Sequence, residues 1–124
     1  MQALQLPPLD EGEIYVGAIG DQKGEAYHLI LLPGDSERAE WQAQMDWAKS
    51  IGGDLPNRIE SAMLFAHSTD QFQKAWYWTN ETLAIEDEPD NTSWAWSQTF
   101  SYGDQYYDPK LREFRARAVR RLPI

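Results

Sequence analysis

The sequence predicts an α+β domain in which the strands of a small antiparallel sheet flank two helices. Three observations lead to this prediction: alternating apolar stretches near both ends of the chain, two stretches with helical periodicity in the middle, and turn-forming residues between them. The expected order is two strands, two helices and three strands, with the helices covering one side of the sheet. A chain of 124 residues has the size of one domain, which we expect over residues 13–124 after an extended lead-in over residues 1–12.

The first two strands are predicted to form a hairpin. The apolar stretches Ile14–Gly20 and Ala26–Pro33 flank the turn-forming residues 21–24, Asp-Gln-Lys-Gly. Both faces of the second stretch are mostly apolar, which is typical of a strand in the centre of a sheet.

The first helix is expected to begin after Ser36, because serine often caps a helix N-terminus. Trp41, Met45 and Ala48 are spaced to share one face of this helix. The pair Gly52-Gly53 then supplies a residue with positive φ, which ends a helix.

The second helix is predicted to begin with a capping box. Asn57 follows Pro56, which disfavours helical backbone at the preceding residue, and Glu60 lies three residues after Asn57. We therefore interpret Asn57 and Glu60 as structural residues. The buried face of this helix is predicted to consist of four residues: Ile59, Ala62, Met63 and Ala66.

Three further strands are expected after the helices, at residues 76–81, 93–100 and 114–122. Alternation places the tryptophans of each strand on one face, and Gln98, which shares a face with two of them, needs partners for its amide if it is buried. We predict that the tryptophans form the core rather than a platform for stacking sugars. This prediction covers Trp76, Trp78, Trp94 and Trp96 in the strands, and Trp41 and Trp47 in the first helix.

Charge is unevenly distributed along the chain, whose net charge is −9. Residues 1–109 hold 5 basic and 19 acidic side chains, whereas residues 110–124 hold 6 basic and 1 acidic. Because an acidic body repels phosphate, we expect no nucleic-acid partner. The basic segment alternates as a strand does, so we expect it to pack against acidic surface rather than to form a nucleic-acid arm.

Several classes of protein are disfavoured by what the sequence lacks. Without cysteine there is no disulfide, no thiolate nucleophile and no cysteine-ligated metal, and we expect no cofactor. The first residues contain neither a basic segment nor an apolar one of the signal-peptide type. No apolar run approaches the ~18 residues of a membrane helix, so we expect no membrane partner.

Four motifs occur in an order that resembles a known family. These are residues 52–60 (GGDLPNRIE), 76–81 (WYWTNE), 94–103 (WAWSQTFSYG) and 115–121 (RARAVRR). The pattern is similar to that of the Lcl C-terminal-domain-like family of bacteria and phages, and it covers residues 41–121. The resemblance implies a C-type lectin-like fold in which the N- and C-terminal strands pair. The forms of the first and last motifs resemble those of the prophage branch of the family.

Catalytic chemistry has little support in the sequence. The formylglycine-generating enzymes share the fold that the resemblance implies, but their chemistry needs cysteines, which this chain lacks. The only histidines are His28 and His67, and no G-x-S-x-G elbow accompanies them. A weak imitation of a lectin calcium motif occurs at Glu88, Asp90 and Asn91, but the second motif of such sites is missing. We therefore expect no metal.

Two polar stretches remain as candidates for ligand contact, residues 86–93 and 101–110. They combine tyrosine with Asn, Ser and Asp, as paratopes do. The candidate ligand-binding residues are Asn91, Tyr102, Asp104, Gln105, Tyr106 and Tyr107. An ordinary polar turn with its tyrosines packed down explains residues 101–110 equally well.

The expected function is that of a non-catalytic binding module of phage or prophage type, with a protein or glycan ligand. We expect it in the cytoplasm of a bacterial host or on a virion, and self-association stays open. One alternative is a phage inhibitor that docks on a host protein through its acidic face, and another is a small enzyme without a recognisable motif. An enzyme would place His28 or His67 in a pocket beside a carboxylate, whereas a binding module would expose tyrosines beyond Ser101.

Overall fold

The computed structural model describes residues 3–83 and 93–124, and in these residues the chain is a mixed α+β protein with two sheets. The three-stranded sheet has the order β1-β2-β8 and the five-stranded sheet the order β3-β7-β4-β5-β6. The strands are β1 (Ile14–Gly20), β2 (Ala26–Leu31), β3 (Ser36–Ala39), β4 (Trp76–Leu83), β5 (Trp94–Thr99), β6 (Gln105–Pro109), β7 (Phe114–Ala116) and β8 (Val119–Pro123). The strands are thus divided between two sheets, whereas the sequence predicts a single one.

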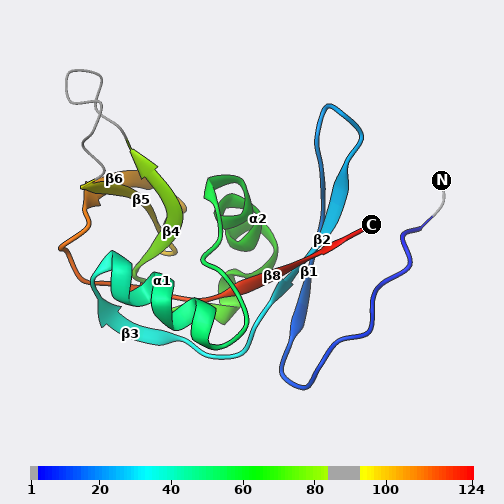
Figure 1. Ribbon diagram of the computed structural model, residues 1–124, viewed down its shortest axis with the longest axis horizontal. Coiled ribbons are helices and arrows are strands. Elements are labelled where there is room, and N and C mark those ends of the chain that lie inside the picture. The colour runs from blue at the N-terminus through cyan, green and yellow to red at the C-terminus, as the bar shows by residue number, and fades with distance from the viewer. Residues whose placement is uncertain (1–2, 84–92) are drawn as a thin grey trace.

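The two helices are α1 (Trp41–Ser50) and α2 (Arg58–Ser68), and a single 3-10 turn follows α2 at Thr69–Gln71. Helix α1 packs on β3, β4 and β7, whereas α2 packs on β1, β4 and β5. Figure 1 shows α2 between the β1–β2 hairpin and the strands of the larger sheet. This helix is therefore the element that joins the two halves of the molecule.

Strand β2 lies in the centre of its sheet, as its two apolar faces predict. It pairs antiparallel with β1 on one side and with β8 on the other, and Leu29, Ile30 and Leu31 are fully buried. The prediction that the N- and C-terminal strands pair is therefore wrong, because β2 lies between them. The physical reason is that β2 buries both faces and needs a neighbour on each edge.

The C-terminal basic stretch forms two strands in different sheets instead of the single strand predicted. Strand β7 joins the larger sheet, where Arg115 pairs in parallel with Tyr77, and β8 joins the smaller one. The chain changes sheet at Arg117 and Ala118, where Leu32 N–H donates to Ala118 C=O. Residues 105–109, expected in a loop, form the edge strand β6.

The start of α1 also differs from the prediction. Ser36 begins β3, paired with β7, and the helix begins at Trp41. Ser36 therefore caps no helix. Pairing with β7 satisfies backbone groups over residues 36–39 that a longer helix would otherwise have used. The end of α1 is as predicted, since Gly52 has φ 86°.

Two apolar clusters lie on opposite sides of β4. Trp78 belongs to the cluster that includes Trp41 of α1, whereas its neighbour Tyr77 belongs to the cluster that includes Leu64 of α2. Neighbouring residues of a strand point to opposite faces, so β4 is covered on both sides. The expectation that helices cover one side of the sheet is wrong for this strand.

The buried face of α2 differs from the predicted one, of which only Met63 packs against an apolar cluster. Ile59 is 67% exposed, and Ala62 and Ala66 are exposed as well. The helix instead buries Glu60, Ser61, Leu64 and Ser68. A polar set can be buried here because an arginine and a glutamine approach the helix from neighbouring strands, as described below. Apolar periodicity alone therefore selected the wrong face.

The basic C-terminal segment packs against acidic side chains, as its charge predicts. Arg120 binds Glu13 through two bonds of 2.8 Å, and Arg115 lies 3.4 Å from Asp35. The hydrogen bonds from Arg120 lower the pKa of Glu13 below its usual value although burial acts in the opposite direction. Among residues 3–83 and 93–124 no helix is long and apolar enough to cross a membrane.

Candidate functional site

The predicted capping box at the start of α2 is present. The Asn57 side chain accepts a hydrogen bond from the backbone N–H of Glu60, and the Glu60 carboxylate accepts one from the backbone N–H of Asn57, each 2.8 Å long. Glu60 is nevertheless more than a cap, because its side chain is fully buried. A buried carboxylate needs further partners if it is to stay ionised.

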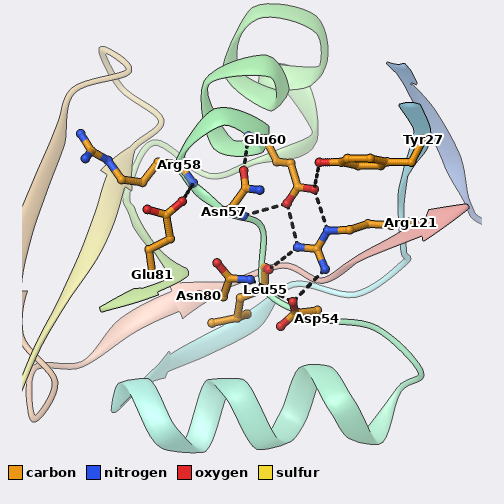
Figure 2. A network of polar contacts seen from close by, with 9 residues as sticks. All are labelled: Tyr27, Asp54, Leu55, Asn57, Arg58, Glu60, Asn80, Glu81 and Arg121. Carbon is orange, nitrogen blue, oxygen red and sulfur yellow. Dashed lines mark hydrogen bonds and ion pairs between the residues drawn. The ribbon is translucent and has the colours of Figure 1, made fainter. Parts of the chain in front are cut away.

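Those partners come from the smaller sheet and from the segment before α2 (Figure 2). Arg121 of β8 holds both carboxylate oxygens of Glu60, at 2.7 and 2.8 Å. The Tyr27 hydroxyl of β2 donates to the same carboxylate at 2.6 Å. Arg121 also donates to Asp54 at 2.8 Å. We call this cluster of Tyr27, Asp54, Asn57, Glu60 and Arg121 the polar joint.

The electrostatics of the polar joint are those of a closed structural site. Burial acts to raise the pKa of Glu60, but the hydrogen bonds from Arg121, Tyr27 and Asn57 outweigh it and lower that pKa. Burial and the bond to Glu60 raise the pKa of Tyr27 to about 12. A general acid or base works best with a pKa near the operating pH, and both shifts lead away from neutrality. The joint therefore connects α2 to β2 and β8, and the pKa shifts of Glu60 and Tyr27 both lead away from the range of a general acid or base at neutral pH.

The two histidines lie in different elements, His28 in β2 and His67 near the end of α2. His28 is 6% exposed and its Nδ1 lies 2.8 Å from the Tyr15 hydroxyl, whereas His67 lies exposed near the end of α2. No group of three or more His, Cys, Asp or Glu within residues 3–83 and 93–124 could hold a metal ion. The weak calcium candidates Glu88, Asp90 and Asn91 lie outside the described residues.

The candidate ligand-contact residues lie along β6 and the turn before it. Tyr102, Tyr106 and Tyr107 are 82%, 57% and 50% exposed, and Asp104 is exposed with its carbonyl bonded to Thr99. Gln105 is engaged instead, because its amide donates to Gln98 at 2.9 Å and to the Arg58 carbonyl at 2.8 Å. Asn91, the remaining candidate, falls in the part of the chain that is not described.

Tyr106 and Tyr107 are neighbours on β6 and therefore project from opposite faces of the edge strand. Tyr107 meets Trp94 and Trp96 edge-on at 5.9 and 5.3 Å between ring centroids. Tyr106 meets Trp76 edge-on at 5.7 Å. We call the five rings of Trp76, Trp94, Trp96, Tyr106 and Tyr107 the aromatic edge. The tyrosines predicted as one contact surface in residues 101–110 therefore lie on two surfaces, one on each face of β6.

The prediction that the tryptophans form the core holds for only part of the set. Trp41 and Trp78 are buried, at 8% and 1% exposure, whereas Trp47 and the three tryptophans of the aromatic edge are half-buried. On β5 the small residues Ala95, Ser97 and Thr99 are buried, and so is Gln98. Gln98, on the tryptophan face, finds its predicted partners, since its amide donates to the Ser61 carbonyl at 2.6 Å.

Sequence reasoning missed a pocket beside the aromatic edge. It is lined by Trp76, Tyr106, Tyr107, Asp108, Arg112 and Phe114. Phe114 arrives from β7, whose pairing with β4 joins residues far apart in sequence. No local signal in the sequence indicates that β7 pairs with β4. The ion pair at the pocket could have been found from the sequence, because Asp108 and Arg112 have i, i+4 spacing.

Comparisons with known proteins identify no family for this chain. No protein-family model matches the chain, and a search of curated proteins finds no similar sequence. The resemblance of residues 41–121 to the Lcl C-terminal-domain-like family therefore stays a prediction.

Proposed function

We propose that this protein is a non-catalytic binding module that recognises a protein or glycan ligand through its aromatic edge. The observation that carries the proposal is the exposure of Tyr106 and Tyr107 on a strand whose backbone is paired with β5. Tyrosine contributes a large, stiff and amphipathic contact area at low cost in conformational entropy. Tyrosine and tryptophan also dominate the residues whose loss weakens binding most.

The geometry of the rings favours recognition because they are held in place before any ligand arrives. Tyr106 and Tyr107 are each supported edge-on by a half-buried tryptophan. Trp96 is itself covered by the Arg58 guanidinium, whose central carbon lies 3.6 Å from the ring centroid. A ligand that binds here would not have to order these side chains.

An enzymatic function has weaker support from the same residues. The most densely connected charged cluster is the polar joint, whose carboxylate is ionised and fully partnered. The two histidines lie apart from the aromatic edge, in β2 and near the end of α2.

The proposal also includes the fold family, the phage origin and the location that are predicted from the sequence. We infer a C-type lectin-like fold from the order of the four motifs and from the placement of both terminal strands in one sheet. A phage or prophage origin, with the protein in the host cytoplasm or on the virion, rests on the resemblance alone. The inhibitor alternative differs in using the acidic face, so it predicts a different set of sensitive residues.

The proposal is tested by comparing ligand capture by the wild type and by a variant with Tyr102→Ala, Tyr106→Ala and Tyr107→Ala. Immobilised protein would be exposed to a bacterial lysate and, separately, to a glycan array. We expect at least one ligand to be retained by the wild type and lost by the triple variant. Circular dichroism and thermal unfolding would establish that the variant keeps its fold.

A control variant with Ile59→Ala removes an exposed apolar side chain of α2, outside the aromatic edge. It should retain every ligand that the wild type retains. Equal capture by the wild type and the folded triple variant would contradict the proposal. Loss of binding on neutralising acidic residues, with the tyrosines unimportant, would favour the inhibitor alternative.

A further inference from the structure

We infer that the pocket beside Tyr106 is a subsite for one residue of a neutral saccharide. This inference rests on the proposed function and names the ligand class of one face of the aromatic edge. The pocket has a volume of about 360 Å³, near the lower limit of the ~300–1,000 Å³ usual for small-molecule sites. Its size therefore suits a single sugar ring with the rest of a chain outside.

Aromatic rings form the walls of this pocket. The rings of Trp76 and Phe114 lie 6.1 Å apart between centroids and are inclined by only 30°, and Tyr106 closes the side at 63° to Trp76. The face of an aromatic ring carries negative potential and attracts the weakly positive hydrogens of C–H groups. A pyranose offers such hydrogens on one flat face, so it can pack against the aromatic side chains that line the pocket.

The walls are fixed from the core outward. Trp78 is 1% exposed, and its indole N–H donates to the Ala39 carbonyl at 3.1 Å. Phe114 packs on this ring at 4.7 Å between centroids, and Trp76 packs on Phe114 in turn. The exposed part of the pocket is thus continuous with a buried cluster, and little conformational entropy is lost on binding.

Polar groups at the rim complete the match. Asp108 and Arg112 form an ion pair with a long separation of 3.7 Å, and their side chains are 20% and 63% exposed. The other contact of the Asp108 carboxylate, with the Ser97 hydroxyl, is also long at 3.4 Å. A carboxylate accepts and a guanidinium donates hydrogen bonds. Neighbouring hydroxyls of a sugar donate and accept, so they can bind both groups at once.

The charges point to a neutral ligand. The opposite charges of Asp108 and Arg112 cancel at the rim, and the chain as a whole carries a net charge of −9. An acidic glycan or a nucleotide would be repelled by this net charge. A proline-rich peptide also docks on aromatic rings, but its backbone carbonyls only accept hydrogen bonds and would offer no donor to the Asp108 carboxylate.

The test uses four neutral hexasaccharides, made of α-glucose, β-glucose, mannose or N-acetylglucosamine, titrated into ¹⁵N-labelled protein. The indole N–H signals of the tryptophans report on binding, and the Trp76 signal is identified from a Trp76→Phe variant. We expect at least one saccharide to shift the Trp76 signal in a saturable way. Tyr106→Ala and Arg112→Ala should each weaken this binding at least tenfold.

Ile59→Ala is the control, because it removes an exposed side chain that does not line the pocket. Its affinity should equal that of the wild type. The inference is overturned if no saccharide shifts the Trp76 signal or if the three variants bind the saccharide with equal affinity. It is also overturned if a decaproline peptide shifts the Trp76 signal and none of the saccharides does. Capture of a protein that depends on Tyr106 or Tyr107, together with no saccharide binding, would overturn this inference alone and leave the proposed function intact.

Discussion

The polar joint and the aromatic edge, taken together with its rim residues Asp108 and Arg112, each contain a tyrosine, a carboxylate and an arginine. The two regions differ in how closely these groups are hydrogen-bonded and how deeply they are buried. In the polar joint, Arg121 and Glu60 lie 2.7 Å apart and Glu60 is fully buried. At the aromatic edge, Arg112 and Asp108 are 3.7 Å apart and partly exposed. The Tyr27 hydroxyl donates to Glu60, whereas Tyr106 is 57% exposed.

The difference shows what each set of groups can contribute. A buried ion pair with all of its hydrogen bonds made is costly to break, because the remaining charge is left in an apolar environment. An exposed pair is worth little to stability, since water replaces either partner. The polar joint therefore stabilises the connection between the sheets, whereas the donors and acceptors of Asp108 and Arg112 stay partly accessible to solvent.

The largest effect is expected from Glu60→Ala. This change leaves Arg121 partly buried and removes both the capping bond and the bond from Tyr27, so the free energy of unfolding should fall by about 3–5 kcal/mol. Urea denaturation at pH 7 measures the loss. Asp108→Ala is the matched change at the aromatic edge and should cost less than about 1 kcal/mol. Equal losses in the two variants would show that the two regions do not differ in this way.

The second expected effect is on the pH dependence of stability. Because the folded protein lowers the pKa values of Glu60 and Glu13, their stabilisation is complete above the unfolded value of about 4.5 and is lost as pH falls through the folded pKa values. Thermal unfolding between pH 7 and pH 2 measures this loss. Glu60→Gln should flatten the profile below pH 4.5. An unchanged profile would mean that Glu60 does not titrate with folding.

At alkaline pH, stability is expected to fall as pH rises, and the cause is the tyrosine of the same polar joint. The folded protein raises the pKa of Tyr27 to about 12, above the unfolded value of about 10. This contribution is therefore complete below pH 10 and is lost as pH rises through about 12. Tyr27→Phe should remove the step of one half-buried phenol from the ultraviolet titration. A step that persists in the variant would assign it to another tyrosine.

A smaller loss is expected from Asn57→Ala, which removes one bond of the capping box. Substitution of a capping asparagine by alanine costs about 1 kcal/mol. The loss should be seen in urea denaturation and should not depend on any ligand. Asn57→Ser, which keeps an acceptor at this position, should restore most of the stability, and a failure to do so would contradict the role of the cap.

The smallest effect on stability is expected from Tyr106→Ala. Its side chain is 57% exposed, and substitutions at such positions usually change stability by less than about 0.5 kcal/mol. The same variant should lose ligand affinity, which is the reverse of the pattern at Glu60. A loss of several degrees in the unfolding temperature would place Tyr106 in the stabilising framework instead.

Local features of the fold could be predicted because their determinants lie within a few residues of one another. The β1–β2 hairpin, the end of α1 at Gly52 and the capping box of α2 are of this kind. The interaction of the basic C-terminal segment with acidic partners was also predictable, since an excess of charge of one sign must be balanced. The predicted contact residues Tyr106 and Tyr107 are exposed, but their placement on opposite faces required knowledge of β6.

The failures have a common cause in pairing between distant segments. Alternation along residues 114–122 indicates a strand, but it does not indicate that β7 pairs with β4 while β8 pairs with β2. Periodicity likewise defines the faces of α2 without telling which one is buried, because Arg121 is the residue that makes a buried Glu60 favourable.

The sequence by itself determined where the chain turns, where α2 begins and which segments alternate, because hydrogen bonding and steric limits between neighbouring residues act in any environment. Only the tertiary structure decided which tryptophans are covered, where the last strand pairs and which arginine meets which carboxylate. These outcomes depend on surfaces that come together only when the chain has folded, and the free energy of burying each one is set by its partner.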